Sequence, residues 1–250
     1  MTPARATKTD ARRAPDCCRL THTEAVEDTL RTIFVLAGRG DSVSTSAIAD
    51  ELRVTAPTVS TMLKRLVEHG LARRTDDHGV RLTEHGARHA RRIVRAHRLA
   101  ETFMATMLEV PWDEVHAEAD LLEHALSDRL LGRLDDLLGH PSADPHGDPI
   151  PPSEGAHSEH WGQRLDAVEP GSEFTVERVY DRDSEALRYL AELGVRPGVT
   201  VTVVEHAPFG GPLWIELDGR RVALGEPLVR LVHGSPGSRG AVHHAHGRAG

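Results

Sequence analysis

The sequence has almost no cysteine, so disulfide bonds do not hold this protein together. The 250-residue chain has two cysteines, Cys17 and Cys18, which are adjacent in a polar N-terminal segment. Neighbouring cysteines in such a segment cannot cross-link a core, and scarce cysteine is typical of the reducing cytoplasm. We therefore expect a cytoplasmic protein whose domains are stabilised by apolar cores.

Long apolar runs are missing as well. No segment approaches the ~18 consecutive apolar residues that a transmembrane helix needs. The charged N-terminus also lacks the apolar stretch of a secretory signal. The sequence predicts no membrane partner.

Positive charge is in deficit, with a formal net charge of −8, so the molecule as a whole is not a basic nucleic-acid coat. The distribution is uneven, however. Residues 52–74 carry five Lys or Arg against one Glu, whereas residues 98–136 carry ten Asp or Glu against three Arg. The first segment suits an anion such as DNA phosphate, and the second suits cations.

The signatures of common enzymes are also absent. The sequence contains no HExxH motif, no nucleophile elbow and no phosphate-binding loop. Histidine and carboxylate ligands also build metal-dependent hydrolases and oxygenases, so a metalloenzyme is an alternative to a binding protein. Without those motifs, we expect no enzymatic activity.

The N-terminal third has the pattern of a winged helix-turn-helix. Apolar periodicity and Gly or Pro punctuation predict helices over residues 24–37, 44–52 and 56–69. Two short alternating runs, 71–75 and 80–83, flank a turn-forming tip and predict a hairpin. Three helices followed by a hairpin place the third helix in a DNA major groove.

The rest of the chain changes from helices to strands. A long helix is expected from Thr83 to Met107, and one or two more from Trp112 to Leu138. A segment rich in Pro, Gly, His and Ser (139–165) indicates a linker. Beyond it, alternating runs at 174–179, 199–204, 213–217 and 221–224, with a helix at 184–193, predict a small five-stranded barrel.

The fold class expected is therefore mainly α with a small β domain. The domain boundaries expected are a disordered tail at 1–20, the winged helix-turn-helix at 21–84, a helical domain at 85–140, a linker at 141–170, the barrel at 171–233 and a second tail at 234–250.

Small polar residues gather at the start of the third helix, where base edges are read. The residues expected there are Thr55, Pro57, Thr58, Ser60 and Thr61. We expect Lys64, one turn further, and Arg73 and Arg74 on the first wing strand to contact phosphates. The alternatives are a helical bundle in which Ser and Thr only cap a helix, and a winged helix used for protein interaction.

Four candidate metal ligands recur at helical spacing in one segment. His116, Asp120, Glu123 and His124 lie at i, i+4, i+7 and i+8, within about 100° of one another on a helix. His97 and Glu101 form another i, i+4 pair. Imidazole with carboxylate suits manganese, ferrous iron or zinc. The alternative is an acidic solvated face with incidental histidines, since the chain has 17 His.

Several segments resemble the DtxR/MntR family of metal-dependent repressors. They are EDTLRTI (27–33), APTVS (56–60), RAHRLAE (95–101), VHAEADLLEHALSD (115–128) and DPHGDPIP (144–151). The segment LRYLAELGVRPG (187–198) is similar to the SH3-like domain called FeoA. The resemblance covers about residues 21–235. It implies a homodimer that binds a double-stranded DNA operator, a central helical dimerisation domain that carries metal, and a C-terminal SH3-like barrel.

The resemblance also implies two metal sites per subunit. The regulatory site would use Asp28 from the first helix with Asp120, Glu123 and His124. The ancillary site would use His97, Glu101 and His116 with one acid from the barrel. That acid is Asp183 by alignment, or else Glu185. An alternative role for Asp183 is to cap the helix that follows it.

Two departures from the family pattern bear on the metal. The iron-sensing branch has Met at the position of Asp28 and Cys at that of Asp120. Oxygen ligands at both positions favour Mn²⁺, with Fe²⁺ as the alternative in a repressor of the same fold. The short manganese-sensing members lack the barrel and have Glu where this chain has Arg31. Two separated metal sites are therefore expected rather than a close pair.

Overall fold

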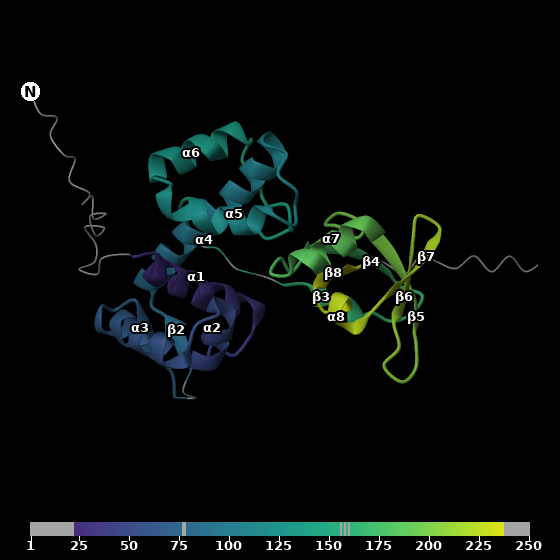
Figure 1. Ribbon diagram of the computed structural model, residues 1–250, viewed down its shortest axis with the longest axis horizontal. Helices are drawn as coiled ribbons and strands as arrows, with labels where there is room; N and C mark the ends of the chain where they lie inside the picture. Colours follow the sequence, from purple (N-terminus) through teal and green to yellow (C-terminus); the bar gives the residue numbers. More distant parts are fainter. Residues whose placement is uncertain (1–22, 77–78, 156, 158, 160, 238–250) are drawn as a thin grey trace, which may run out of the picture. The chain divides into compact units, whose positions relative to one another are not determined.

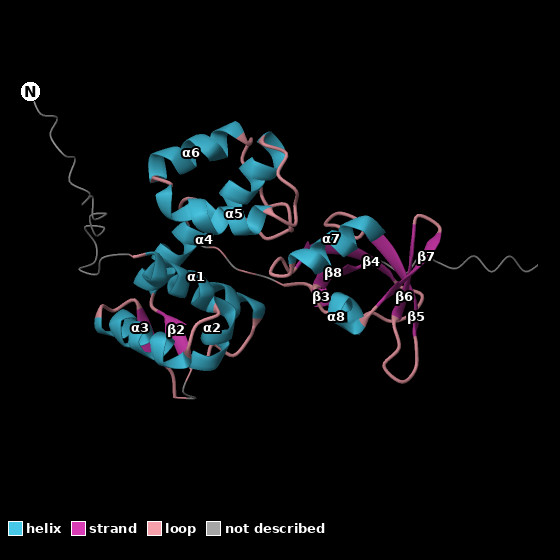
Figure 2. Cartoon of the chain, in the orientation of Figure 1, coloured by secondary structure: helices cyan, strands magenta, loops and turns pink. Residues whose placement is uncertain are grey.

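The computed structural model describes residues 23–76, 79–155, 157, 159 and 161–237, in two compact units. One unit comprises residues 1–95 with 151–158, and the other residues 96–150 with 159–250. The prediction of a disordered tail at 234–250 is wrong at its start, because residues 234–236 belong to strand β8 (Val232–Pro236). The rest of that prediction at 238–250, the predictions for the tail at 1–20 and for Cys17 and Cys18, and the centre of the wing tip lie outside the described residues. Figures 1 and 2 show helices through the N-terminal and central parts and strands mainly in the C-terminal part.

The first unit contains the predicted winged helix-turn-helix. Its helices are α1 (Glu24–Arg39), α2 (Thr45–Leu52) and α3 (Ala56–Glu68). Its wing pairs β1 (Ala72–Arg74) with β2 (Val80–Leu82) in antiparallel register. Local chemistry explains the boundaries: Gly40 ends α1 with φ 79°, and Ser44 and Thr55 cap the next two helices by accepting backbone N–H bonds. All three helices were predicted to within about two residues.

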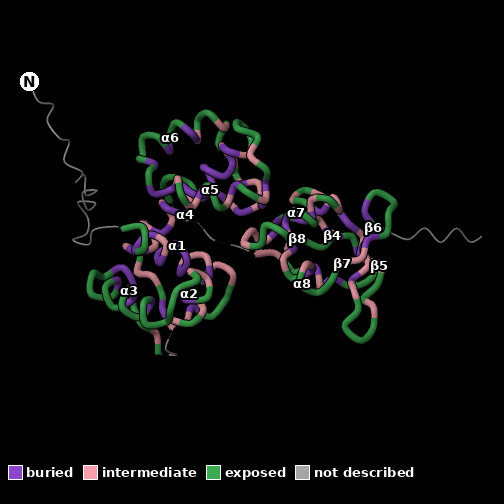
Figure 3. The backbone as a smooth tube through the Cα atoms, in the orientation of Figure 1, coloured by how far each residue is buried: buried purple, intermediate pink, exposed green. Residues whose placement is uncertain are grey.

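The apolar faces of these helices form one core. Val26, Leu30 and Ile33 of α1 pack with Ile48 of α2 and Leu63 of α3, all with no exposed surface. Figure 3 shows α3 alternating between buried and exposed positions. One apolar stripe on each helix is therefore enough to build this domain, while the opposite face of α3 stays available.

Helix α4 (Glu84–Met107) runs from the first unit into the second, where α5 (Val115–Leu122), a 3₁₀ turn (Glu123–Ala125) and α6 (Asp128–Leu137) follow. The predicted continuous helix across His116–His124 is wrong. It stops at Leu122, and Leu126 is extended because Ser127 begins α6 as its cap. Glu123 and His124 therefore lie on the tighter turn, where side-chain spacing differs from that of an α-helix.

The C-terminal domain is a six-stranded antiparallel sheet with strand order β3-β8-β4-β5-β6-β7. The predicted strands correspond to β4 (Glu173–Val179), β5 (Thr200–His206), β6 (Leu213–Leu217) and β7 (Arg220–Leu224). Helix α7 (Ser184–Leu193) was also predicted, whereas the short α8 (Glu226–Val229) was not. The predicted strand number is corrected by β3 (Gln163–Arg164), which pairs with β8 (Val232–Pro236).

The predicted linker is also partly ordered. Asp144, His146, Asp148 and Ile150 are buried, because the segment around them is fastened to its surroundings by hydrogen bonds. Arg98 of α4 donates to the Pro149 carbonyl at 2.6 Å, and Val179 of β4 donates to the His146 carbonyl at 2.9 Å. Proline and glycine there produce a tight folded loop rather than a free connection.

No described helix combines the length and apolar composition that crossing a membrane requires.

Two glycines test the packing of this fold. A Cβ at Gly86 of α4 would lie 1.9 Å from the Leu71 carbonyl oxygen, whereas one at Gly132 of α6 would meet nothing within 4 Å. We expect Gly86→Ala to lower the free energy of unfolding by about 1–3 kcal/mol. Gly132→Ala, the matched control, should raise it by about 0.5–1 kcal/mol. Urea unfolding followed by circular dichroism measures both, and equal effects would contradict the described contact.

Candidate metal centre

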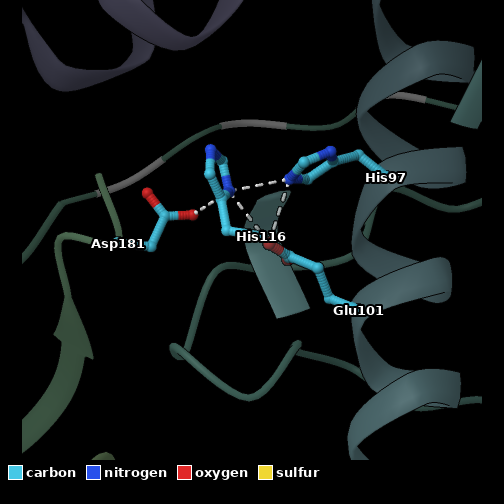
Figure 4. Close-up of side chains that lie close together, drawn as sticks. All are labelled: His97, Glu101, His116 and Asp181. Atoms are coloured by element: carbon cyan, nitrogen blue, oxygen red, sulfur yellow. Dashed lines mark hydrogen bonds and ion pairs between the residues drawn. The ribbon is translucent and has the colours of Figure 1, made fainter. Parts of the chain in front are cut away.

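Four ligand-type side chains from three parts of the second unit converge on one point (Figure 4). His97 and Glu101 come from α4, His116 from α5, and Asp181 from the segment after β4. His116 Nδ1 lies 3.1 Å from His97 Nε2, 3.1 Å from Glu101 Oε1 and 2.9 Å from Asp181 Oδ2. We call these four residues the interdomain cluster, because they join the helical domain to the barrel.

Packing between the helical domain and the barrel places the cluster. Trp112, just before α5, belongs to the barrel's own core and is 8% exposed. Arg196 stacks over its ring at 4.8 Å. Beside it, Arg188 of α7 pairs with Asp113 at 2.9 Å. Asp181 is therefore presented to α5 by a docked domain.

The electrostatics of the interdomain cluster favour a positive charge at its centre. Burial opposes a charged imidazole, but the Asp181 and Glu101 carboxylates together outweigh burial and raise the pKa of His116 to about 10. Burial likewise opposes a charged Glu101, yet His97 and His116 hold the pKa of its carboxyl below its usual range. His116 also holds the pKa of Asp181 well below its usual range. The surrounding carboxylates therefore stabilise positive charge at this point.

The donor set and its spacing fit a divalent ion. Two imidazoles and two carboxylates are its ligands, and Glu101 Oε2 and His116 Nε2 have no hydrogen-bond partner among the described residues. The four ligand atoms all lie within 4.8 Å of one another, so one ion can contact all of them.

Part of the predicted regulatory set adjoins this cluster. Glu123 Oε2 lies 2.6 Å from His97 Nδ1, and Glu123 Oε1 lies 3.4 Å from His124 Nε2. Asp120 Oδ1 is 3.5 Å from His97 Nδ1. Within the second unit the structure thus brings Asp120, Glu123 and His124 near one another. Asp28 is half-buried on α1 in the first unit, and its part in that site stays a prediction.

The barrel acid in the interdomain cluster is Asp181, and neither Asp183 nor Glu185 reaches it. Asp183 is exposed and caps α7, accepting a hydrogen bond from the Ala186 N–H at 3.0 Å. Glu185 is exposed in the first turn of α7. The correction follows from chain geometry, because an acid that caps a helix points along that helix. The sequence YDRD offered two acids, and only the tertiary contact distinguishes them.

Buried charges that the sequence analysis missed surround the cluster. Arg98 pairs with both oxygens of Glu159, and Arg178 of β4 contacts Glu159 at 3.3 Å and Asp148 at 2.8 Å. Burial, helped by the Asp148 and Glu101 carboxylates, raises the pKa of Asp144 well above its usual range. In the sequence, Arg98 and the acids of DPHGDPIP were the available signal for this network of buried charges. Their partners lie up to 61 positions away in sequence, so residue spacing did not identify them.

The candidate DNA-contact residues all lie on the exposed surface of the first unit. Thr55, Pro57, Thr58, Ser60, Thr61, Lys64, Arg73 and Arg74 are all exposed. Thr55 also caps α3 through the Thr58 N–H, so the capping role is present. Arg73 lies directly opposite Arg81 across the wing. Facing like charges destabilise a hairpin, and an anion bound between them removes that cost.

Comparisons with known proteins agree with this arrangement. A family described as "Iron dependent repressor, N-terminal DNA binding domain" matches residues 21–80, and one described as "Iron dependent repressor, metal binding and dimerisation domain" matches residues 83–152. A FeoA domain matches residues 163–236. The "Iron-dependent repressor IdeR" of Mycobacterium tuberculosis is 36% identical over 223 residues, covering 84% of this chain and 96% of the relative. The chain belongs to the DtxR/MntR family of metal-dependent repressors.

Other relatives include a further curated repressor and two solved structures named for manganese. The "Diphtheria toxin repressor" of Corynebacterium diphtheriae is 26% identical over 84% of this chain and 96% of its own length. A solved "Manganese-dependent transcriptional repressor complex with manganese" is 39% identical, with TM-score 0.78, over 84% of this chain and 98% of that one. The manganese regulator SloR is 32% identical, with TM-score 0.72, over 83% and 96%. The chain is thus a metal-dependent transcriptional repressor and not an enzyme.

Asp181 and Asp183 form a matched pair for testing the interdomain cluster. We expect Asp181→Asn to weaken Mn²⁺ binding by about tenfold or more, because the substitution removes a charged ligand. Asp183→Ala should leave Mn²⁺ affinity unchanged and lower stability by about 1 kcal/mol through loss of the cap. Calorimetric titration and thermal unfolding measure the two effects. A loss of affinity in the Asp183 variant alone would overturn the assignment.

Proposed function

We propose that this DtxR/MntR family member is a manganese-activated homodimeric repressor that binds a double-stranded operator. The observation that carries the proposal is the donor chemistry. The candidate ligands at the interdomain cluster and at Asp120, Glu123 and His124 are nitrogen and oxygen atoms, with no sulfur among those the structure describes. Manganese competes poorly for thiolate and thioether ligands but accepts imidazole and carboxylate. The manganese named for the 39% identical structure supports the same metal.

Iron activation is the second candidate. The 36% identical relative is named an iron-dependent repressor, and ferrous iron also accepts imidazole and carboxylate. Manganese is preferred because Asp28 and Asp120 stand where the iron-sensing branch has sulfur ligands.

Activation is proposed to work by linkage between metal and DNA. Asp28 lies on the first helix of the DNA-binding domain, while Asp120, Glu123 and His124 lie in the dimerisation domain. If these residues share one ion, binding restricts the angle between the domains and hence the spacing of two α3 helices in a dimer. The interdomain cluster would add ligands from the barrel and order it with the helical domain.

DNA binding should therefore require a divalent metal. We expect Mn²⁺ to tighten operator binding by about 5–150-fold relative to excess chelator, the range of typical allosteric coupling. Mobility shifts measured against free Mn²⁺ and, in the absence of oxygen, against free Fe²⁺ test this. Equal mobility shifts in chelator and in Mn²⁺ would contradict activation by metal.

The double variant Asp28→Met with Asp120→Cys should respond better to Fe²⁺ than to Mn²⁺. An unchanged preference of the double variant for Mn²⁺ would contradict the argument that ligand type sets metal selectivity.

The basic side chains of the wing should position DNA without reading it. Arg73→Ala should weaken binding to operator and unrelated DNA alike and reduce the slope of log K against log salt by about 0.9 per lost phosphate contact. Arg230→Ala on the barrel, where Arg230 pairs with Glu226, is the control and should change neither. Substituting Pro57 or Thr61 should instead alter base preference. If Arg73→Ala changes preference at a constant salt slope, the roles are reversed.

A further inference from the structure

Two histidines at the start of α4 face each other outside the candidate metal centre. His85 and His89 are four positions apart, and their Nε2 atoms lie 3.0 Å from each other. The centroids of the two rings are 4.9 Å apart. Both residues are half-buried, so an ion that keeps some of its water can still reach them. They belong to the first unit, whereas all four residues of the interdomain cluster belong to the second.

The helix backbone that carries this pair is fixed on both sides of it. Thr83 Oγ1 donates to the Gly70 carbonyl at 2.6 Å and accepts from the Gly86 N–H at 3.1 Å, which anchors the first turn of α4 to the end of α3. One turn further, Ala90 is fully buried in the apolar core of the first unit. Side chains at i and i+4 share one face of an α-helix. The fold therefore holds the two rings together before any ligand binds.

A hydrogen bond between the two rings is the simple alternative. In that bond, the Nε2–H of one ring donates to the Nε2 lone pair of the other. The same arrangement directs both Nε2 atoms at one point, as chelation of an ion requires. Bonds of about 2.0–2.1 Å let one ion span two nitrogens up to about 4 Å apart. The observed separation therefore allows one ion to contact both rings.

We propose that His85 and His89 together bind a divalent ion that prefers imidazole, such as Zn²⁺ or Ni²⁺, with water as the remaining ligands. The donor set carries the choice of ion. Two histidines at i, i+4 on one helix face are a recurrent zinc-binding pair, whereas manganese favours carboxylate, carbonyl and water oxygens. Glu84, the acid next to His85 in sequence, pairs instead with Arg88 at 3.4 Å. The proposal is independent of the manganese sites of the proposed function.

An ion at this pair holds the first two turns of α4 together. Strand β2 ends at Leu82 and α4 begins at Glu84, so these turns directly follow the wing. Amides at a helix end exchange with solvent when the end opens, and a ligand that binds only the closed helix suppresses that opening by mass action. At an ion concentration of 100 times the dissociation constant, exchange through local opening should slow by about 100-fold.

The test compares the full-length protein with His85→Gln and with His89→Gln. Glutamine keeps a donor and an acceptor for a side-chain hydrogen bond but lacks the imidazole that zinc and nickel prefer, so it separates chelation from hydrogen bonding. Each protein is titrated with Zn²⁺ and, in a second arm, with Ni²⁺. Equilibrium dialysis counts the bound ions, and hydrogen–deuterium exchange mass spectrometry follows residues 84–92. We expect each variant to bind one ion fewer per subunit, or to bind it about tenfold or more weakly, and to lose the slowed exchange.

The control is His69→Gln. His69 is exposed at the end of α3, and the residues four positions to either side of it are Arg65 and Arg73, which leaves it without a chelating partner at that spacing. This variant should keep the ion count and the slowed exchange of the parent. The three histidines of segment 243–246 are present in every protein compared, so ions that they bind cancel.

Two results would overturn the site. One is an equal ion count with equal exchange at residues 84–92 in the parent and in both variants of the pair. The other is the same loss in His69→Gln as in those variants, which would assign the ion to surface histidines in general. Operator binding with Mn²⁺ is measured separately, so either result leaves the proposed function to its own test.

Discussion

The docking of the barrel onto the helical domain is the constraint on which the candidate metal chemistry depends. Trp112 is buried in the barrel core, and Arg98 and Arg178 both pair with Glu159. Buried ion pairs contribute little net stability, but they are sensitive to geometry, because each charge is costly without its partner. The network therefore holds β4, and with it Asp181, at one place relative to α4.

Because Asp181 is held there, the candidate ligands of the two predicted sites form one connected set of side chains. Glu123 contacts both His97 and His124, so one carboxylate belongs to the surroundings of both predicted sites. The hydrogen bond of 2.6 Å between Glu123 and His97 lies in a buried setting, where electrostatic effects are strong. Under the proposed function, this contact is the physical link between the charge at one predicted site and the charge at the other.

The exposed surface of the first unit and the interior of the second unit carry different kinds of charged side chain. The exposed face of α3 and the wing carries hydroxyl groups and arginines, which suit phosphate and base edges. The second unit gathers acids and imidazoles in its interior, which suit a divalent ion. The overall negative charge hides this division, and the local distribution along the chain predicts it.

Local chemistry was enough to predict most of the elements and the family. Periodicity, caps and glycine stops located α1, α2, α3 and α7, and the i, i+4 spacing identified His97 with Glu101, because these signals act within one or two turns. The sequence alone also predicted candidate ligands of two types, nitrogen and oxygen. The choice of Asp181 over Asp183, the burial of His146 and the sixth strand were decided by tertiary structure. Each depends on contacts between segments tens of residues apart, which neither spacing nor propensity encodes.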